Sequence, residues 1–230
     1  MRIRFAFVIC ALGLLAPAIA QAQKVEVAPG VVVTRKTYQV PSNEAPFFNF
    51  IEKNEGQKAT DERLIAGLIQ QGYGRAEAAD AAIVSGTRIF LQDRDVATAA
   101  KRFNQAYLLD PQQSGIYHGF AMVVTDRFKD FEYADELYRV AARMKSPAAS
   151  LSADHGRMFL MAGRPTDAVP LLRKAVVDTP EWVVPRMNLA WAVLLSGNRD
   201  EACRLKAQVK GQGQDNVLQD LKVFQQKANC

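Results

Sequence analysis

The residue types that most often do chemistry are few in this chain. Beyond residue 22 it has two histidines, His118 and His155, and neither has a second histidine or cysteine at metal-ligand spacing. The motifs of zinc proteases, serine hydrolases, P-loop nucleotide-binding proteins and CxxC dithiol proteins do not occur. We therefore predict no metal, no cofactor and no enzymatic activity. An enzyme or a small-ligand carrier would need a pocket that no motif marks.

Two cysteines, Cys203 and Cys230, remain if the first 22 residues are removed. We interpret them as a disulfide that fixes the end of the chain, because an exported protein meets an oxidising compartment. The alternative is a buried Cys203 and a free Cys230 that can cross-link two chains. The sequence does not give the Cα separation that a disulfide requires, so both interpretations stay open.

Residues 1–22 have the three parts of a secretory signal peptide. Arg2 and Arg4 come first, and an apolar run over residues 5–16 follows that is short for a membrane helix. Residues 20–22 (Ala-Gln-Ala) offer a cleavage site, with residues 18–20 as the alternative. We expect cleavage near Ala22 and a periplasmic or secreted chain without membrane insertion. The short, alanine-rich leader is typical of bacteria.

Composition indicates a folded protein with little preference for nucleic acid. The chain has 230 residues, of which 49% are hydrophobic and 23% charged. Its formal net charge is +5, and loss of Arg2 and Arg4 with the leader lowers it to +3. No lysine and arginine cluster accompanies this weak charge, which argues against a nucleic-acid partner.

A repeat of 34 or 35 residues is the strongest pattern in the sequence. Three series of mostly small residues keep this spacing: Ala99, Ala134, Ala168 and Ala202; Ala106, Ala141, Ala175 and Val209; and Thr87, Ala121, Gly156 and Ala190. Each unit contains two helical stretches, which in the first unit are residues 80–91 and 96–109. Small residues let two antiparallel helices cross closely, and Phe103 and Leu172 would fill the adjoining space.

These units resemble the tetratricopeptide repeat (TPR), a pair of antiparallel helices. The end of the TPR signature is matched by Ala99, Phe103 and Pro111, and again by Ala168, Leu172 and Pro180. The second unit has one extra residue, which we assign to a loop over residues 125–132, and the fourth lacks the terminal proline. The resemblance covers residues 80–216 and implies an all-α fold, a right-handed α-solenoid of about four helix pairs.

In the TPR family the first helix of each pair lines a concave face that holds a peptide. The resemblance therefore implies a protein-binding wall on these helices. Its candidate residues are Arg88, His118, Met122, Arg157, Met187, Asn188 and Trp191. The same stripes include Val84, Leu91, Thr125, Ala153, Leu160 and Leu194. Such a wall is apolar with two guanidinium groups, and it suits an apolar peptide that carries an acidic group.

These candidates also have plainer interpretations. Trp191 and the leucines can belong to the core. Arg88 and Arg157 can be solvated or can pair with an aspartate such as Asp126 or Asp154, and His118 is a wall residue rather than a metal ligand. Asn188 has no asparagine at the matching position of the other units, so the asparagine ladder that holds a ligand backbone in the family is absent.

Two segments precede the repeats. Residues 23–58 lack a helical period and are expected to form an irregular arm with short extended pieces around Pro29 and Gly30. The aromatic residues at 47–50 either cover a helix face or dock onto another chain, and we favour the first. Residues 59–79 are expected to hold a leading helix that Thr60 caps and that ends at Gly72.

The last segment is expected to close the stack. Residues 215–228 have the pattern of one final helix, with Val217, Leu221 and Phe224 on one face. A terminal repeat needs a cover with a polar outer side, and we therefore assign residues 217–230 to a C-terminal cap helix.

Together these patterns predict an exported TPR-like protein that binds another protein or a peptide segment. It would be an adaptor or scaffold in envelope assembly or secretion. A self-associating structural protein whose aromatic arm docks onto a neighbour is the alternative in the same class. An enzyme or a small-ligand carrier is the alternative in another class.

Overall fold

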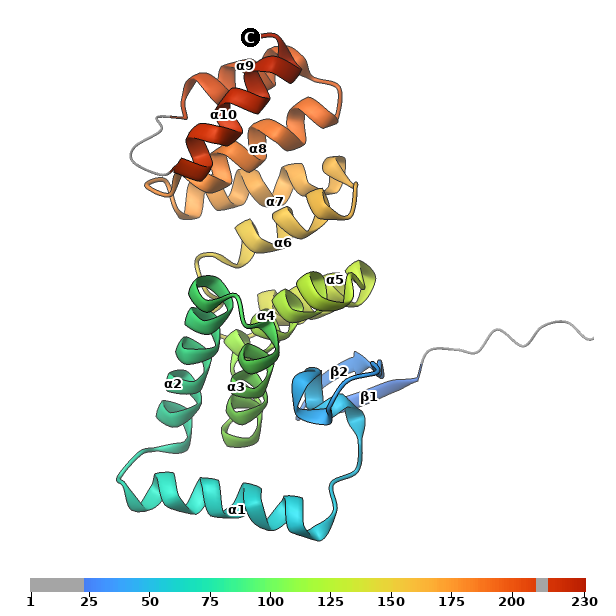
Figure 1. Ribbon diagram of the computed structural model, residues 1–230, viewed down its shortest axis with the longest axis vertical. Helices are drawn as coiled ribbons and strands as arrows, with labels where there is room; N and C mark the ends of the chain where they lie inside the picture. The colour runs from blue at the N-terminus through green and yellow to red at the C-terminus, as the bar shows by residue number, and fades with distance from the viewer. Residues whose placement is uncertain (1–22, 210–214) are drawn as a thin grey trace, which may run out of the picture.

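The computed structural model describes residues 23–209 and 215–230 as an elongated stack of helices with a β-hairpin at its side (Figure 1). The predicted signal peptide, residues 1–22, lies outside the described residues. The described part holds ten α-helices and a two-stranded antiparallel sheet. None of these helices combines the length and the apolar character that crossing a membrane requires.

Eight helices form four successive antiparallel pairs (Figure 1). The pairs are α2 (Arg75–Arg88) with α3 (Val96–Leu109), α4 (Ser114–Val123) with α5 (Phe131–Arg143), α6 (Leu151–Met161) with α7 (Pro165–Asp178), and α8 (Val183–Leu195) with α9 (Arg199–Ala207). The predicted all-α solenoid of four helix pairs is confirmed.

Small residues let the helices of each pair approach closely. Ala99, Ala134, Ala168 and Ala202 have no exposed surface. A Cβ atom added to Gly86 would lie 2.8 Å from the Phe103 ring, and one added to Gly156 would lie 2.6 Å from Leu172. The predicted position Thr87 is therefore wrong by one residue, because Gly86 is the small residue that faces Phe103.

Two π-helical turns explain the uneven spacing of the units. The turns η3 (Ile89–Asp93) and η4 (Val124–Phe128) end the first helix of the first and second pairs. Each is followed by one left-handed residue, Arg94 or Lys129, whereas the later pairs turn at glycines. A π turn accommodates one more residue than an α turn. The extra residue of the second unit therefore lies in the helical turn η4 rather than in a loop over 125–132.

The N-terminal arm begins with a hairpin. Strand β1 (Lys24–Ala28) pairs with β2 (Val31–Thr34) around Gly30, whose φ of +75° suits glycine. The short helical turns η1 (Ser42–Glu44) and η2 (Pro46–Phe50) follow. The predicted extended pieces around Pro29 and Gly30 are confirmed.

The Phe47 side chain anchors this arm to the repeats. Its ring centroid lies 4.9 Å from that of Phe120 and 5.3 Å from that of Tyr107, and the residue is buried. Beside it the buried Asn104 accepts a hydrogen bond from the Phe48 N–H at 3.0 Å. The prediction that aromatic residues of the arm cover a helix face is confirmed for Phe47.

The leading helix starts earlier than predicted. Helix α1 (Glu55–Gln70) is capped by Asn54, which accepts from the Gln57 N–H at 2.9 Å, while the Gln57 side chain accepts from the Asn54 N–H at 3.0 Å. The helix therefore begins at this reciprocal capping box and not at Thr60, which lies inside the helix and donates to the Gly56 carbonyl oxygen. The predicted end near Gly72 is confirmed. The first repeat helix, α2, starts at Arg75 rather than at residue 80.

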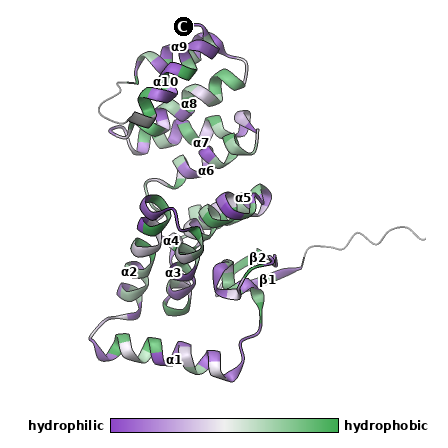
Figure 2. Ribbon diagram, viewed as in Figure 1, coloured by the Kyte–Doolittle hydropathy of each residue, from purple (hydrophilic) through white to green (hydrophobic). Residues whose placement is uncertain are grey.

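Helix α10 (Asp215–Ala228) closes the other end of the stack. Its buried face includes Val217, Phe224 and Ala228. The opposite side is mostly hydrophilic, apart from the exposed Leu218 and Val223, and Figure 2 shows purple stretches along α10. The predicted cap helix is thus present.

Candidate protein-binding site

The predicted wall residues divide into an open group and a buried group. Val84 and Leu91 are 67% and 51% exposed, and both predicted arginines, Arg88 and Arg157, are exposed. The buried group consists of His118, Met122, Thr125, Ala153 and Met187. The open part of the wall therefore lies on α2, η3 and α6.

A small cavity of about 20 Å³ lies where η3, α4, η4 and α6 meet. Residues that line it include Leu91, Met122, Thr125, Tyr138, Arg157 and Met161. The buried Thr125 hydroxyl is beside the Tyr138 hydroxyl but makes no hydrogen bond of normal geometry. A cavity of this size holds one water-sized group. The lining is therefore mixed: apolar side chains, the carboxylates of Asp126 and Asp154, the Arg157 guanidinium, and Thr125, whose hydroxyl lies beside that of Tyr138.

Arg157 stands at this cavity as a cation without an ion pair among residues 23–209 and 215–230. Arg88 makes one weak, half-exposed contact, at 3.8 Å from Asp93. Asp154, a suggested partner for these arginines, is bonded to His118 instead. Arg157 is therefore exposed and without an ion pair in the described ranges, at a cavity that Asp126 and Asp154 also line.

His118 is not an open wall residue, and this expectation is wrong. Its Nε2 lies 3.0 Å from Oδ2 of Asp154 on α6, and Nε2 of His155 lies 2.7 Å from Oδ1 of Asp135 on α5. The two imidazole rings lie on either side of Tyr138. Burial lowers the pKa of His155, and the Asp135 carboxylate opposes this shift only in part. The two histidine–aspartate contacts therefore join the second pair of helices (α4 and α5) to helix α6 of the third pair.

The cap helix covers the wall on the fourth pair. Met187 is 1% exposed, and the Trp191 ring lies 4.9 Å from Phe224 of α10 in an edge contact. Both were candidate binding residues, and for Trp191 packing in the core was the alternative; Met187 is buried, and the half-buried Trp191 packs against the cap, as that alternative predicts. Asn188 is half-buried on α8, and its role in binding stays a prediction.

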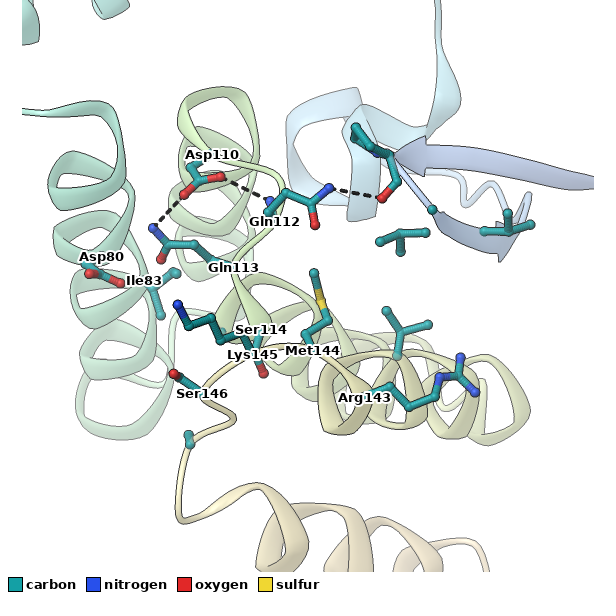
Figure 3. Close-up of a pocket in the computed structure, with 17 residues that line it drawn as sticks. Asp80, Ile83, Asp110, Gln112, Gln113, Ser114, Arg143, Met144, Lys145 and Ser146 are labelled. Atoms are coloured by element: carbon teal, nitrogen blue, oxygen red, sulfur yellow. Dashed lines mark hydrogen bonds between the residues drawn. The ribbon is translucent and has the colours of Figure 1, made fainter.

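A larger groove, of about 960 Å³, lies between the hairpin, α2 and the end of α5 (Figure 3). It includes Val32, Ile83, Arg143 and Lys145. It shares no lining residue with the cavity at Arg157. The sequence does not predict this groove, because its walls come from segments that lie far apart in the chain.

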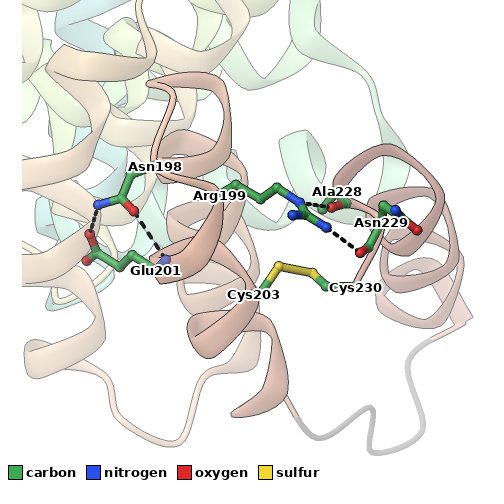
Figure 4. The surroundings of a disulfide bond; sticks show 7 residues. All are labelled: Asn198, Arg199, Glu201, Cys203, Ala228, Asn229 and Cys230. Atoms are coloured by element: carbon green, nitrogen blue, oxygen red, sulfur yellow. Dashed lines mark hydrogen bonds between the residues drawn. A yellow bond between two sulfur atoms is a disulfide. The ribbon is translucent and has the colours of Figure 1, made fainter.

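The predicted disulfide between Cys203 and Cys230 is present, with the Cα atoms 6.0 Å apart (Figure 4). The Arg199 guanidinium donates to the carbonyl oxygens of Ala228 and Asn229 at 2.5 and 2.6 Å. One covalent bond and two charge-assisted hydrogen bonds therefore hold the end of α10 to α9.

The placement of the titratable side chains can be compared with what a metal site or a catalytic triad requires. Within the described ranges no three His, Cys, Asp or Glu side chains are placed to hold a metal ion. The two Asp–His pairs resemble half of a catalytic triad. In this part of the chain no serine, threonine or cysteine is hydrogen-bonded to His118 or His155, so neither ring has a nucleophile to activate.

Known proteins give a likeness of fold. No protein-family model and no curated protein matches the chain. Among solved structures, TTC0263, a TPR protein of Thermus thermophilus, matches with a TM-score of 0.46 and 20% identity over 75% of this chain and 98% of that chain. PilF of Pseudomonas aeruginosa, also a TPR protein, matches with a TM-score of 0.58 and 25% identity over 68% of this chain and 72% of that chain. The chain has the tetratricopeptide-repeat fold.

The TPR fold places wall residues of successive helix pairs close together. The likeness to PilF supports a scaffold for protein–protein interaction in general. In this stack the turn η3 and the helices α4 and α6 bring Leu91, Met122 and Arg157 to one hollow. The cap helix covers Trp191, and the bond to Asp154 keeps His118 away from the surface.

Proposed function

We propose that this TPR protein is an exported adaptor or scaffold of the bacterial envelope, in assembly or secretion. It holds a partner protein on the concave face around Arg157. The observation that carries the proposal is the exposed Arg157 guanidinium, which makes no ion pair within residues 23–209 and 215–230 and lies at a hollow that the buried Thr125 also lines. Arginine beside desolvated apolar surface is a common anchor of protein interfaces.

The chemistry of the hollow selects the kind of partner. Exposed Leu91 and Met161 line the same hollow as Arg157 and offer apolar contact there. A carboxylate can accept two parallel hydrogen bonds from one guanidinium group. The partner segment is therefore apolar and carries an acidic side chain or a terminal carboxylate.

Two observations support export. Residues 1–22 have the pattern of a cleavable signal peptide, and the chain beyond them contains a disulfide. Disulfides persist in oxidising compartments and are rare in the cytosol. A fusion of the chain to alkaline phosphatase, which is active only after export, tests this part. An inactive fusion contradicts export.

A pull-down from envelope extract tests the concave-face adaptor. The bait is the tagged mature chain, compared with Arg88→Glu/Arg157→Glu and with the matched control Arg204→Glu/Lys222→Glu. The control changes the same charge at exposed residues of α9 and α10. All three baits must show equal helicity and melting temperature. We expect a partner that the wild type and the control retain and that the Arg88/Arg157 variant loses.

Two results contradict the proposal. A partner that all three baits retain equally places the binding surface elsewhere. Recovery of the chain alone, together with a mass in solution that rises with concentration, favours self-association instead.

A further inference from the structure

The groove in Figure 3 has a fixed floor and three walls. Gln112 Nε2 donates to the Pro29 carbonyl oxygen at 3.0 Å, and Gln113 Nε2 donates to the Ala76 carbonyl oxygen at 2.9 Å. These bonds tie the segment between α3 and α4 to the hairpin turn on one side and to α2 on the other. The groove is therefore formed before any ligand arrives.

One wall is the outer edge of β2. The Arg35 N–H donates to the Gln23 carbonyl oxygen at 2.8 Å, so the alternating register turns the backbone groups of Val32 and Thr34 away from β1. The Thr34 N–H donates to a Glu136 carboxylate oxygen of α5 at 2.9 Å. In the described part of the chain, the outward groups of Val32 have no such partner. Val32 is 49% exposed and lines the groove, so this position of the strand edge is open.

The wall at the end of α5 is basic. Arg143 and Lys145 are exposed, line the groove and make no ion pair in the described ranges. Asp110 faces the same groove, but its carboxylate accepts from the Gln112 N–H and from the Gln113 side chain. Asp80 lies on the opposite wall, on α2 (Figure 3). The α5 side of the groove therefore complements a negative charge.

We propose that this groove binds an extended, acidic segment of a second protein. The segment adds to the edge of β2 at Val32 and places a carboxylate against Arg143 and Lys145. Main-chain hydrogen bonds at an open strand edge supply affinity, and a charged neighbour supplies the choice of sequence. The site is separate from the hollow at Arg157, so one chain can hold two partners at once and bring them together.

Selection from phage-displayed random dodecapeptides on the immobilised mature chain tests the proposal. Selected peptides are expected to be rich in Asp and Glu that alternate with apolar residues. Measured by fluorescence anisotropy, their affinity is expected to fall at least about tenfold for Arg143→Glu/Lys145→Glu. The matched control Arg204→Glu/Lys222→Glu is expected to bind as the wild type does. Methylation of alternate peptide N–H groups removes strand pairing and is expected to weaken binding by a similar factor.

The same selection can overturn the proposal. Failure to enrich any peptide contradicts it, and so do peptides that bind Arg143→Glu/Lys145→Glu as tightly as the wild type. Peptides that lose affinity only with Arg88→Glu/Arg157→Glu support the concave-face site and reject this one. Equal binding of a methylated peptide rejects strand addition. Both variants must keep the melting temperature of the wild type.

Discussion

Single buried polar groups decide which parts of the concave face are free for a partner. His118 and His155 each use a carboxylate within the chain, and this removes them from the surface. Thr125 is equally buried but has no hydrogen bond of normal geometry, and it borders the cavity at Arg157. A buried hydroxyl without a well-formed hydrogen bond costs folding free energy, so Thr125 is a position at which stability and partner binding can be tested together.

Replacement of Thr125 by valine tests this cost. Valine has nearly the same shape without the hydroxyl, so Thr125→Val is expected to raise the free energy of unfolding by about 1 kcal/mol. The same variant is expected to bind the partner more weakly. Urea denaturation and the pull-down measure the two effects. Thr125→Ser keeps the hydroxyl and serves as the control, and a loss of stability in Thr125→Val contradicts the account.

The buried His155 gives the chain a pH dependence. Its pKa lies below the ordinary value of 6.5 because burial disfavours the charged ring. Between the folded and the unfolded pKa, the unfolded chain therefore binds more protons than the folded one. The stability of the folded protein is full above pH 6.5 and falls as the pH drops through the folded pKa. Urea denaturation at pH about 7.5 and about 5.5 should show this fall. His155→Gln should show a smaller one, and an equal fall in both contradicts the assignment.

Two elements outside the repeats, the arm and the cap helix, cover surfaces that the repeats would otherwise expose. The arm inserts Phe47 between α3 and α4. The cap covers Trp191 of α8 and is bonded to α9 through Cys203 and Cys230. Each element therefore stabilises one end of the solenoid and removes apolar surface from water.

Truncation of Phe47 measures how much the packing of the arm contributes to stability. Phe47→Ala is expected to lower the free energy of unfolding by about 3 kcal/mol or more, because a large buried ring leaves a cavity. Phe48→Ala is the control, since that side chain is only half-buried. Guanidinium denaturation reports both values. Similar small losses in the two variants would show that the arm does not depend on Phe47.

Removal of the disulfide measures how much the covalent link to the cap helix contributes to stability. Cys203→Ser/Cys230→Ser is expected to lose roughly 3 kcal/mol, because the bond closes a loop of 27 residues in the unfolded chain. A free-thiol count on the non-reduced wild type should find none in the mature chain. Two reactive thiols, or equal melting temperatures of the wild type and the double variant, contradict the staple.

Some element boundaries follow from local signals and others do not. Helix α3 has its predicted bounds because Asp95 caps its start and Pro111 follows its end. Helix α1 does not, because Asn54 and Thr60 are both good capping residues and only the reciprocal bond with Gln57 decides between them. The π turns were missed because a repeat length shows that a residue is inserted but not where.

At the scale of the whole molecule, the repeat period correctly predicted a stack of helix pairs, and the resemblance to the TPR family implied which helices line its wall. It did not show which wall residues neighbouring elements cover. Trp191 lies under α10, and His118 lies in the junction with α6. The groove at Val32 and Arg143 was beyond prediction for a similar reason, since a period carries no information on how an irregular arm folds back.

Site-specific photo-crosslinking in cells tests the central claim most directly. A benzoylphenylalanine replaces Leu91, which borders the Arg157 hollow, or Val177, which is 78% exposed on α7. The account predicts a crosslinked partner at position 91 that Arg157→Glu abolishes, and no such adduct at position 177. No adduct at 91, or the same adduct at both positions, would contradict docking on the concave face.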